Sequence, residues 1–424
     1  MTKKRGFNKQ VTFLIFFILL FITIRSIHYV YYLNWSGDQG SYAIEALRIL
    51  KTKSLTLIGP QISANYEGRF IFQGPIIYYF FIFFLLLGKW NPVIASYLFV
   101  LFSSLMIIPL YFGVKKLIHE KAAWIMVIVY TLVPYYIDYS RFLWNSTLLF
   151  SLIPILLLFM GIFKERKQKG IGLFFLISFW LGILLQFHYQ FVLVIAGMFM
   201  YYFIFKKIKR SYLIPFFGGI AVGFSPLIIF ELRHQLYHIK TILLFIRNWS
   251  KVDKPGGITM PHYYISISFM LIVVFLGILV KRIQRVSYGL IIILAFVVGA
   301  YSLYIYSPMP EHAFWAPTTP WNYLAEKKIY DIIRSTDLTN DFNVANLAYY
   351  DTRSSVIKYF MKRDGYMINY DDYYGNRYLF AISEGNKYLS NPSYEIATFT
   401  PHKIIKTWKI NSRYDMVLLE RTSH

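Results

Sequence analysis

The sequence has 424 residues, no cysteine, 57% hydrophobic residues and 15% charged ones. This composition excludes an ordinary soluble protein, and the missing cysteines exclude a disulfide framework, a thiol nucleophile and a cysteine-bound metal. The net charge of +23 lies almost wholly in residues 1–306, where 30 Lys and Arg face 8 Asp and Glu, whereas residues 307–424 hold 14 against 13. Basic residues gather in this way in the cytoplasmic loops of membrane proteins. We therefore predict a polytopic membrane protein with a near-neutral tail.

Nine apolar runs are predicted to span the membrane. The first, residues 11–30, follows a basic flank but has too long a core for a signal peptide and no small-residue cleavage site, so it is a membrane anchor. The other eight lie near residues 93–114, 122–138, 147–163, 171–187, 191–205, 212–230, 263–280 and 287–306. The run from Pro75 to Leu87 is too short for a span, and we expect it to be an interfacial or re-entrant helix.

Four basic clusters fix the predicted orientation. They begin at residues 115, 164, 206 and 281, and all are cytoplasmic only if the run from Pro75 to Leu87 does not cross the bilayer. The N-terminus is then cytoplasmic, residues 31–92 form one large outer loop, and residues 307–424 lie outside the cytoplasm. No internal repeat is evident.

The tail changes character abruptly. It begins with a proline-rich linker that holds Pro308, Pro310, Pro317 and Pro320. Helical periodicity follows at residues 325–333 and 354–361, and strand-like patterns occur at 342–347, 377–382, 403–410 and 415–420. We predict a small extracytoplasmic α/β domain over residues 307–424, beside a membrane domain over residues 1–306.

Acidic residues are scarce before residue 307, so each of the eight is informative. Glu120 and Glu165 stand among cytoplasmic lysines, and pairing with them is the simple explanation. Asp38 and Glu45 follow the first span and share one face of a predicted amphipathic helix on the membrane surface, with Ser41 and Tyr42 in the same polar stripe. The simpler alternative is a solvated face with Asp38 capping the helix after Gly37.

Basic residues gather at the same outer level. They are Arg25, His28, Arg48, Lys51, Lys53, Arg69 and Arg141. Contact with lipid head groups explains Lys51 and Lys53 well. It explains Arg25 and Arg141 less well, because cations at the outer leaflet oppose the positive-inside bias and ionisable groups within spans usually face a polar cavity. A phosphate-bearing substrate at the outer interface would account for them.

Motifs of other chemistries are missing from the sequence. It has no HExxH, paired-histidine or cysteine pattern for a transition metal, and no P-loop, GxGxxG or GxSxG motif. We expect no cofactor, and nothing in the sequence supports a divalent metal. A group transfer would therefore draw on an activated donor already in the membrane. His188 and Tyr189 lie at the outer end of the fifth span, where an interfacial anchor is the commoner role for a lone histidine.

Several short motifs occur together in a recognisable order. They are Gly37-Asp38 past the first span, Gly74-Pro75-Ile76-Ile77-Tyr78-Tyr79, the basic Lys115-Lys116 turn, Tyr139-Ser140-Arg141 followed by Trp144-Asn145, and Leu185-Gln186-Phe187-His188-Tyr189. This order resembles the GT-C glycosyltransferases that use lipid-phosphate sugars, a group containing protein O-mannosyltransferases and lipid A aminoarabinose transferases. The chain departs from the family at Gln39, where Glu is frequent, and at Asn145, where an acidic residue is common.

The resemblance implies transfer of a sugar from a polyprenyl-phosphate carrier to an extracytoplasmic acceptor, with no nucleic acid involved. We predict Asp38 as the general base, with Glu67 as the reserve candidate. Arg48, Arg69 and Arg141 are the predicted phosphate-binding residues, and the predicted substrate-binding residues are Tyr42, Glu45, Glu67, Asn145, His188 and Tyr189. Glu45 is also expected to orient Arg48, three residues further along the helix. The alternatives are a transporter or flippase of lipid-linked glycans, and a non-catalytic cell-envelope scaffold.

Overall fold

The computed structural model describes residues 2–166, 170–252, 264–310, 321–336, 338, 341–349, 351–369, 371–387 and 393–422. Packing divides the chain into two compact units. The helical unit comprises Met1–Ser26, Leu55–Phe80 and Phe99–Ile305. The mixed unit comprises Ile27–Ser54, Phe81–Leu98 and Tyr306–His424, so the predicted C-terminal domain forms one compact unit together with two earlier segments.

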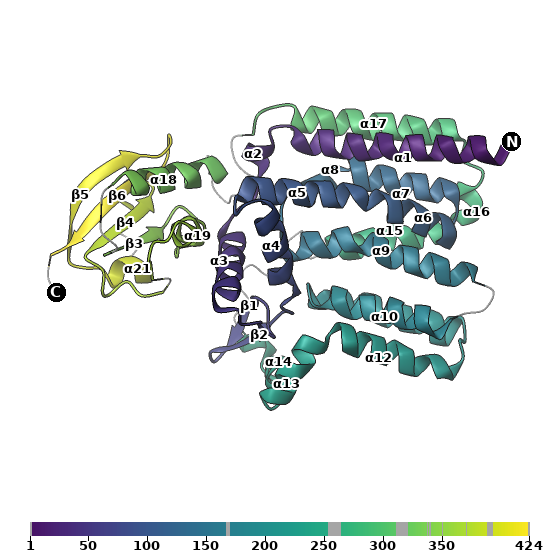
Figure 1. Cartoon of the computed structure of the whole chain (residues 1–424), viewed down its shortest axis with the longest axis horizontal. Helices are drawn as coiled ribbons and strands as arrows, with labels where there is room; N and C mark the ends of the chain where they lie inside the picture. The colour runs from purple at the N-terminus through teal and green to yellow at the C-terminus, as the bar shows by residue number, and fades with distance from the viewer. Residues whose placement is uncertain are drawn as a thin grey trace. The chain divides into compact units, whose positions relative to one another are not determined.

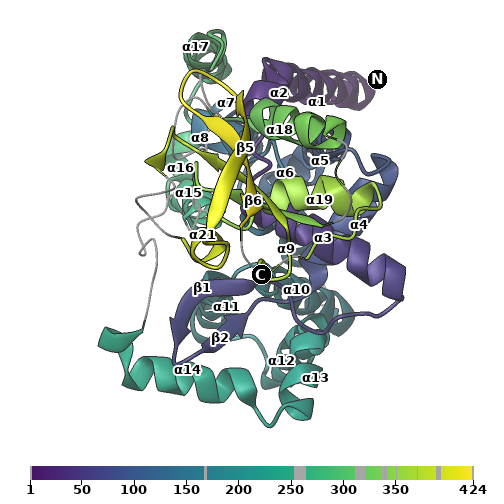
Figure 2. The same cartoon turned by 90° about the vertical axis from the view of Figure 1, so that its left-hand side faces the viewer.

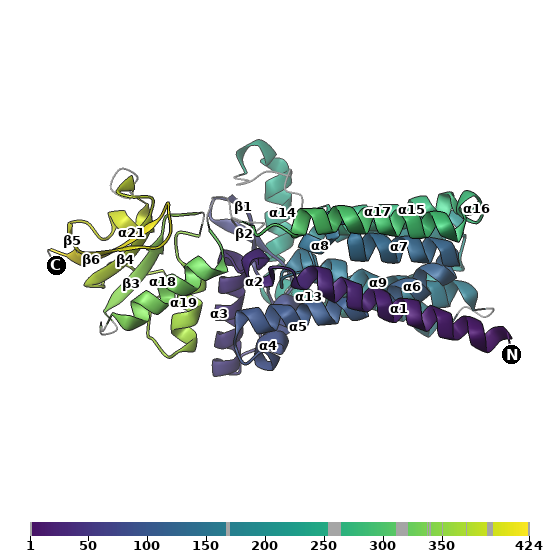
Figure 3. The same cartoon turned by 90° about the horizontal axis from the view of Figure 1, so that it is seen from above.

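The helical unit consists mainly of long apolar helices that run in a common direction (Figure 3). The helices that lie wholly or partly in this unit are α1 (Thr2–Ser26), α4 (Ile76–Leu87), α5 (Pro92–Leu105), α6 (Ile107–Leu117), α7 (Glu120–Leu132), α8 (Pro134–Asp138), α9 (Asn145–Glu165), α10 (Ile171–Leu185), η1 (Tyr189–Phe191), α11 (Val192–Phe199), η2 (Met200–Phe205), η3 (Arg210–Tyr212), α12 (Leu213–Gly223), α13 (Ser225–Arg233), α14 (Tyr237–Arg247), η4 (Trp249–Lys251), α15 (Ile265–Ile278), α16 (Val280–Ile283) and α17 (Tyr288–Tyr306). The boundary between the two units falls within α4 and α5 and at the last residue of α17.

The nine predicted spans all coincide with helices, but their lengths differ. Four helical stretches among the described residues are long and apolar enough to cross a membrane: Lys9–Ser26, Pro92–Leu117, Asn145–Glu165 and Tyr288–Tyr306. A fifth is added if Arg210–Gly223 and Ser225–Arg233, which meet at a 75° bend, count as one span. The chain is thus a membrane protein, while nine spans and the orientation of the termini stay predictions. Helix α4 has the 12 residues of a short apolar helix, as the sequence indicates.

Close helix packing in this unit depends on small residues. Helix α10 packs on α12, and a Cβ on Gly223 would lie 2.1 Å from the carbonyl oxygen of Phe179. Glycine at this position lets the two backbones approach without a side chain between them, which is how apolar helices associate in a bilayer. The predicted pairing of Glu120 and Glu165 with neighbouring lysines is also present, since Glu120 pairs with Lys115 and Glu165 pairs with Lys116.

The mixed unit contains a four-stranded sheet at the C-terminal end of the chain (Figures 1 and 2). Its strands are β3 (Phe342–Asn346), β4 (Tyr378–Ser383), β5 (His402–Lys409) and β6 (Asp415–Arg421), in the order β3-β4-β6-β5 with only the β3–β4 pair parallel. The helices of this unit are α2 (Tyr29–Tyr32), α3 (Gly37–Thr52), α18 (Tyr323–Ser335), α19 (Ser355–Arg363) and α21 (Tyr394–Ala397). All four strands and both tail helices lie where the sequence predicts them. Residues 311–320, which include two of the linker prolines, lie outside the described residues.

The sheet alternates its side chains between two faces, as the strand period requires. On one face Ala345, Leu379 and Leu419 pack with Ile396 and Phe399 from the α21 region in a buried cluster. The intervening positions, such as Val344 and Phe380, are also fully buried. Both faces of this sheet are therefore covered, and helix α19 within this unit also packs against α3.

Candidate active site

Helix α3 presents Asp38 on an exposed surface at its first turn. Ser36 caps the helix, and Gln39 completes a capping box, because the Gln39 side-chain oxygen accepts hydrogen bonds from the Ser36 amide (3.0 Å) and hydroxyl (2.8 Å). Asp38 is exposed while Gln39 is buried. The alternative in which Asp38 merely caps the helix is therefore wrong, since Ser36 and Gln39 perform that task. The Asp38 carboxylate is available to solvent beside the positive end of the helix.

The opposite side of α3 corrects the predicted polar stripe. Tyr42, which the sequence placed among the polar residues, is buried and makes an edge contact with Phe81, at 5.4 Å between ring centroids. Helix α3 buries Tyr42, Ala43, Ala46 and Ile49 against other parts of the protein, including α19. Tyr42 is better placed to hold this helix than to meet a substrate.

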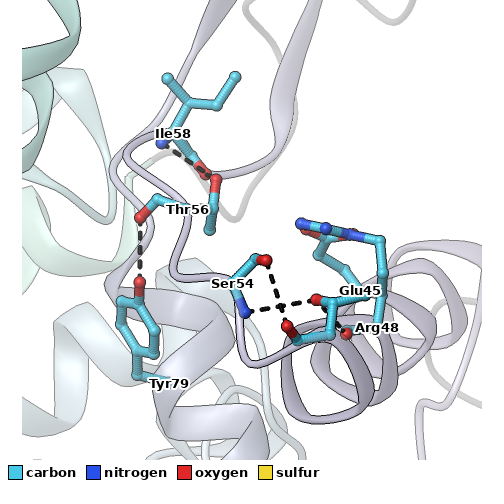
Figure 4. A network of polar contacts seen from close by, with 7 residues as sticks. Glu45, Arg48, Ser54, Thr56, Ile58 and Tyr79 are labelled. Atoms are coloured by element: carbon cyan, nitrogen blue, oxygen red, sulfur yellow. Dashed lines mark hydrogen bonds and ion pairs between the residues drawn. The ribbon is translucent and has the colours of Figure 1, made fainter.

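Glu45 and Arg48 form an ion pair on the outer side of α3 (Figure 4). Two guanidinium nitrogens of Arg48 donate to the two carboxylate oxygens of Glu45, at 2.8 and 2.5 Å. The pair is as the sequence predicts, with Glu45 orienting Arg48. It also neutralises the Arg48 charge, so a phosphate would have to compete with Glu45 for this arginine. Figure 4 also shows the Tyr79 hydroxyl donating to the carbonyl of Thr56, at 2.9 Å.

The motifs around Gly74, Asn145 and Gln186 meet in the helical unit. The Asn145 amide donates to the Gln73 side-chain oxygen at 2.7 Å, and both side chains are buried. The Gly74 amide donates to the Gln186 carbonyl at 2.9 Å, and a Cβ on Gly74 would lie 2.4 Å from the Gln186 side chain. Asn145 is therefore bound to a neutral amide. A carboxylate at this position would face the Gln73 oxygen, an acceptor, unless the Gln73 side chain turned to present its NH2 group. The sequence analysis did not single out Gln73, because it lies one residue before the motif that begins at Gly74.

A β-hairpin in the outer loop carries two of the predicted residues and was missed by the sequence analysis. Strands β1 (Gln61–Tyr66) and β2 (Arg69–Phe72) pair antiparallel, and Glu67 and Gly68 form the turn with positive φ angles of 49° and 71°. Glu67 is exposed at the tip of this turn. Its side chain forms a hydrogen bond with Tyr66, the last residue of β1. Arg69 lies 6.0 Å from the ring centre of Tyr237.

Tyr189 and His238 hold the hairpin at Phe72, the last residue of β2. The Tyr189 hydroxyl donates to the Phe72 carbonyl, and the His238 Nε2 accepts from the Phe72 amide at 3.1 Å. Glu231 lies 2.7 Å from the other ring nitrogen of His238, while burial lowers the pKa of His238. Both ring nitrogens of His238 therefore have partners: Nε2 holds the hairpin at Phe72, and Nδ1 is held by Glu231. Tyr189 has the same structural task, which the sequence did not foresee.

His188 lines a very small cavity between α9, η1 and α15. The lining residues are Ser146, Leu149, His188, Gln190, Phe191, Ser266 and Ile267. Burial lowers the pKa of His188 to about 4, so its ring is neutral, and its Nδ1 accepts from the Gln190 amide at 3.3 Å. The hydroxyls of Ser146 and Ser266 are buried without a hydrogen-bond partner among the described residues. The cavity volume of about 10 Å³ is no more than one water molecule needs, and His188 lies at its edge.

The two arginines that lipid head groups do not explain are both buried. Arg25 donates to the carbonyls of Tyr130 and Thr131 at the end of α7, at 3.1 and 3.0 Å, and to the Ser140 hydroxyl at 2.6 Å. It therefore caps a helix C-terminus and joins α1 to α7, and a role in phosphate binding is not needed to explain it. Arg141 is 1% exposed and donates to the Ile24 carbonyl at 3.0 Å.

The tail contributes charged residues that the sequence did not single out. Asp351 and Lys358 are both buried, and burial raises the pKa of Asp351 to about 6 and lowers that of Lys358 to about 7. The charge of Asp38 adds to the rise at Asp351, so the two carboxylates lie near each other within the mixed unit. No sequence signal links residues 313 positions apart, and only the fold brings them together. Among the described residues, no group of three His, Asp or Glu side chains could hold a metal ion.

Comparisons with known proteins place this fold. A family model described as dolichyl-phosphate-mannose-protein mannosyltransferase matches residues 73–230. The crystal structure of ArnT from Cupriavidus metallidurans bound to undecaprenyl phosphate has a TM-score of 0.56 and 9% identity, covering 96% of this chain and 98% of that one. The resemblance to GT-C glycosyltransferases is confirmed.

Two further structures with the GT-C fold are also similar. Apo ArnT from the same organism gives a TM-score of 0.55 at 9% identity, over 97% of this chain and 98% of that chain. The Archaeoglobus fulgidus oligosaccharyltransferase, in a complex with zinc and sulfate, gives 0.50 at 10% identity, over 87% of this chain and 67% of that chain. No curated protein matches the sequence. The GT-C fold therefore extends along nearly the whole chain, whereas the family match is confined to residues 73–230.

Proposed function

We propose that this protein is a membrane glycosyltransferase that moves a sugar from a polyprenyl-phosphate donor to an acceptor outside the cytoplasm. The match to the mannosyltransferase family model and the GT-C fold shared with a protein that binds undecaprenyl phosphate support the reaction class. The observation that carries the site is the exposed position of Asp38 in the first turn of α3, where Ser36 is the N-cap residue.

Asp38 acts as the general base in this proposal. The acceptor hydroxyl gives its proton to the carboxylate while its oxygen forms a bond to the anomeric carbon. The bond from that carbon to the phosphate oxygen breaks with its electron pair, and polyprenyl phosphate leaves. One displacement inverts the anomeric centre, and the phosphate leaving group needs no separate acid.

The phosphate-binding role falls to arginine. A cation near the leaving oxygen stabilises the charge that develops as the glycosidic bond breaks. Arg141 is the first choice, Arg69 the second, and Arg48 would contribute only after releasing Glu45. His188, whose ring is neutral, is assigned to the sugar or carrier. Asn145, Tyr42 and Tyr189 are assigned to the framework around the substrate, because each is already engaged with protein.

The test begins with the donor. Mass spectrometry of polyprenyl-phosphate sugars in cells lacking the protein should reveal one that accumulates. The Asp38→Asn variant, purified in detergent, should then bind that donor normally but transfer its sugar at least 100-fold more slowly. Asp331→Asn, an exposed carboxylate on α18, is the matched control and should keep full activity. Near-normal transfer by Asp38→Asn with donor binding intact would remove Asp38 from the mechanism and make Glu67 the next candidate.

A further inference from the structure

Helices α3 and α19 approach each other closely at the end of α3 that carries Asp38. A Cβ on Gly40 would lie 2.6 Å from the backbone carbon of Ser355 and from the Val356 amide nitrogen. A Cβ on Gly37 would lie 2.8 Å from Cβ and Cγ of Asp351. These separations are shorter than any real Cβ contact, so both positions require glycine for packing. The start of α3 is therefore fitted against the segment that opens α19.

Polar contacts link the same two segments. The Ser41 hydroxyl donates to the Ser355 hydroxyl at 3.1 Å. Ser355 in turn donates to Asp351 twice, from its amide at 2.7 Å and from its hydroxyl at 2.9 Å. Asp351 is thus held by two donors at the start of α19, and a single serine connects it to α3. The contact is specific in geometry, because each carboxylate oxygen of Asp351 has its own donor.

The charges at this contact are coupled. Asp351 is 8% exposed, and its environment contains Asp38 on α3 and Lys358 on α19. Lys358 is buried, donates to the Tyr373 hydroxyl at 2.8 Å, and also senses Asp371 and Glu395. The charge of Asp38 contributes to the raised pKa of Asp351, so the two carboxylates interact electrostatically. The neighbourhood of Asp38 is therefore partly set by the C-terminal tail.

We propose that Asp351 is a positioning residue for Asp38, through which the C-terminal sheet domain fixes the first turn of α3 and the charge around the base. This inference rests on the proposed function, in which Asp38 takes the acceptor's proton. The ordinary explanation of Asp351 is that it caps α19, and capping alone would affect stability without changing the pH dependence of transfer.

The experiment compares Asp351→Asn with the wild type as full-length protein in detergent, using the donor lipid identified above. Asparagine keeps the shape of the side chain against Gly37 but removes the charge. We expect kcat to fall at least fivefold with the KM for donor unchanged. The wild-type kcat profile should show an inflection near pH 6, where Asp351 ionises beside the base, and Asp351→Asn should lose that inflection.

The matched control is Asp364→Asn, at the other end of α19, where the carboxylate pairs with Arg363. It should leave both kcat and the inflection near pH 6 unchanged. If Asp351→Asn does not fold, Gly40→Ala decides the question, since its methyl group forces α3 away from Ser355 and should lower kcat and weaken the inflection. Wild-type kcat and pH dependence in a folded Asp351→Asn variant would overturn the proposal, as would a lower kcat with the inflection near pH 6 retained.

The two proposals fail in different ways. Loss of transfer in Asp38→Asn together with normal behaviour of Asp351→Asn would leave the glycosyltransferase mechanism in place and reject only the positioning role. Near-normal transfer by Asp38→Asn would reject the base itself. The pair of variants therefore separates an error about the tail from an error about the reaction.

Discussion

Glu326 offers a sharp test of how the C-terminal tail is stabilised. Its side chain is 2% exposed on α18, and one carboxylate oxygen accepts from the Trp321 indole at 3.1 Å and from the Tyr349 hydroxyl at 2.9 Å. The other oxygen has no hydrogen-bond partner among the described residues. Burial raises the pKa of Glu326 from 4.5 to about 8. The folded protein therefore keeps a proton on this group at neutral pH.

The sign and size of the effect follow from linkage. A raised pKa stabilises the folded state below the unfolded-state value of 4.5, and that contribution is lost as pH rises toward 8. Each pH unit in this interval costs about 1.4 kcal/mol, so the loss is on the order of 4 kcal/mol between pH 5 and 8. The Glu326→Gln variant has no proton to lose. Its stability relative to the wild type should rise by that amount over the same interval.

The assay is pulse proteolysis in urea of the purified protein with a C-terminal tag, at pH 5, 6.5 and 8. Comparing variants at each pH cancels the titration of Asp351 and Lys358, which both proteins share. Asp331→Asn, an exposed carboxylate on the same helix, should show a constant difference from the wild type. A constant difference for Glu326→Gln as well would show that Glu326 is ionised in the folded protein and would refute the reasoning.

Three further outcomes are expected. Arg141→Ala should lower transfer at least tenfold while Lys53→Ala changes it little, as measured with purified donor lipid; equal small effects would favour a head-group role for both. Arg25→Met should lower stability by about 3 kcal/mol in detergent unfolding, because the α7 carbonyls that Arg25 satisfies lose their donor, and an unchanged midpoint would contradict the capping role. Gln39→Glu should preserve α3 and its activity because glutamate also completes a capping box, whereas Gln39→Leu should weaken both; equal activity of the two variants would show that the box is dispensable.

Much of the fold could be predicted because its signals are local. Apolar runs, proline positions and strand alternation depend on neighbouring residues, so the helices and all four C-terminal strands lie where the sequence places them. The β-hairpin was missed because the polar turn at Glu67 and Gly68 was considered as part of a loop. The turn holds Glu-Gly, which lacks the Asn-Gly or Asp-Gly signal by which a two-residue hairpin turn is usually found in a sequence.

The candidate site was only partly predictable because its contacts are long-range. The ion pair of Glu45 with Arg48 follows from helix spacing, and it was foreseen. The buried environments of Arg25 and Tyr42 depend on partners more than 35 residues away, which periodicity does not show. Tyr42 was assigned to a polar stripe because its hydroxyl suggested exposure, whereas the fold uses the ring for packing against Phe81.

A general base needs a carboxylate that can meet the acceptor and a backbone that holds it still. Helix α3 meets both conditions with different residues. Asp38 is exposed, while the next two residues, Gln39 and Gly40, are buried. Gln39 is bound to the N-cap residue Ser36, and Gly40 packs against α19. A glutamine at position 39 is therefore consistent with a single catalytic carboxylate, since this side chain works for the helix. The order of the helix start then depends on the tail, and changes in the tail should be felt at Asp38.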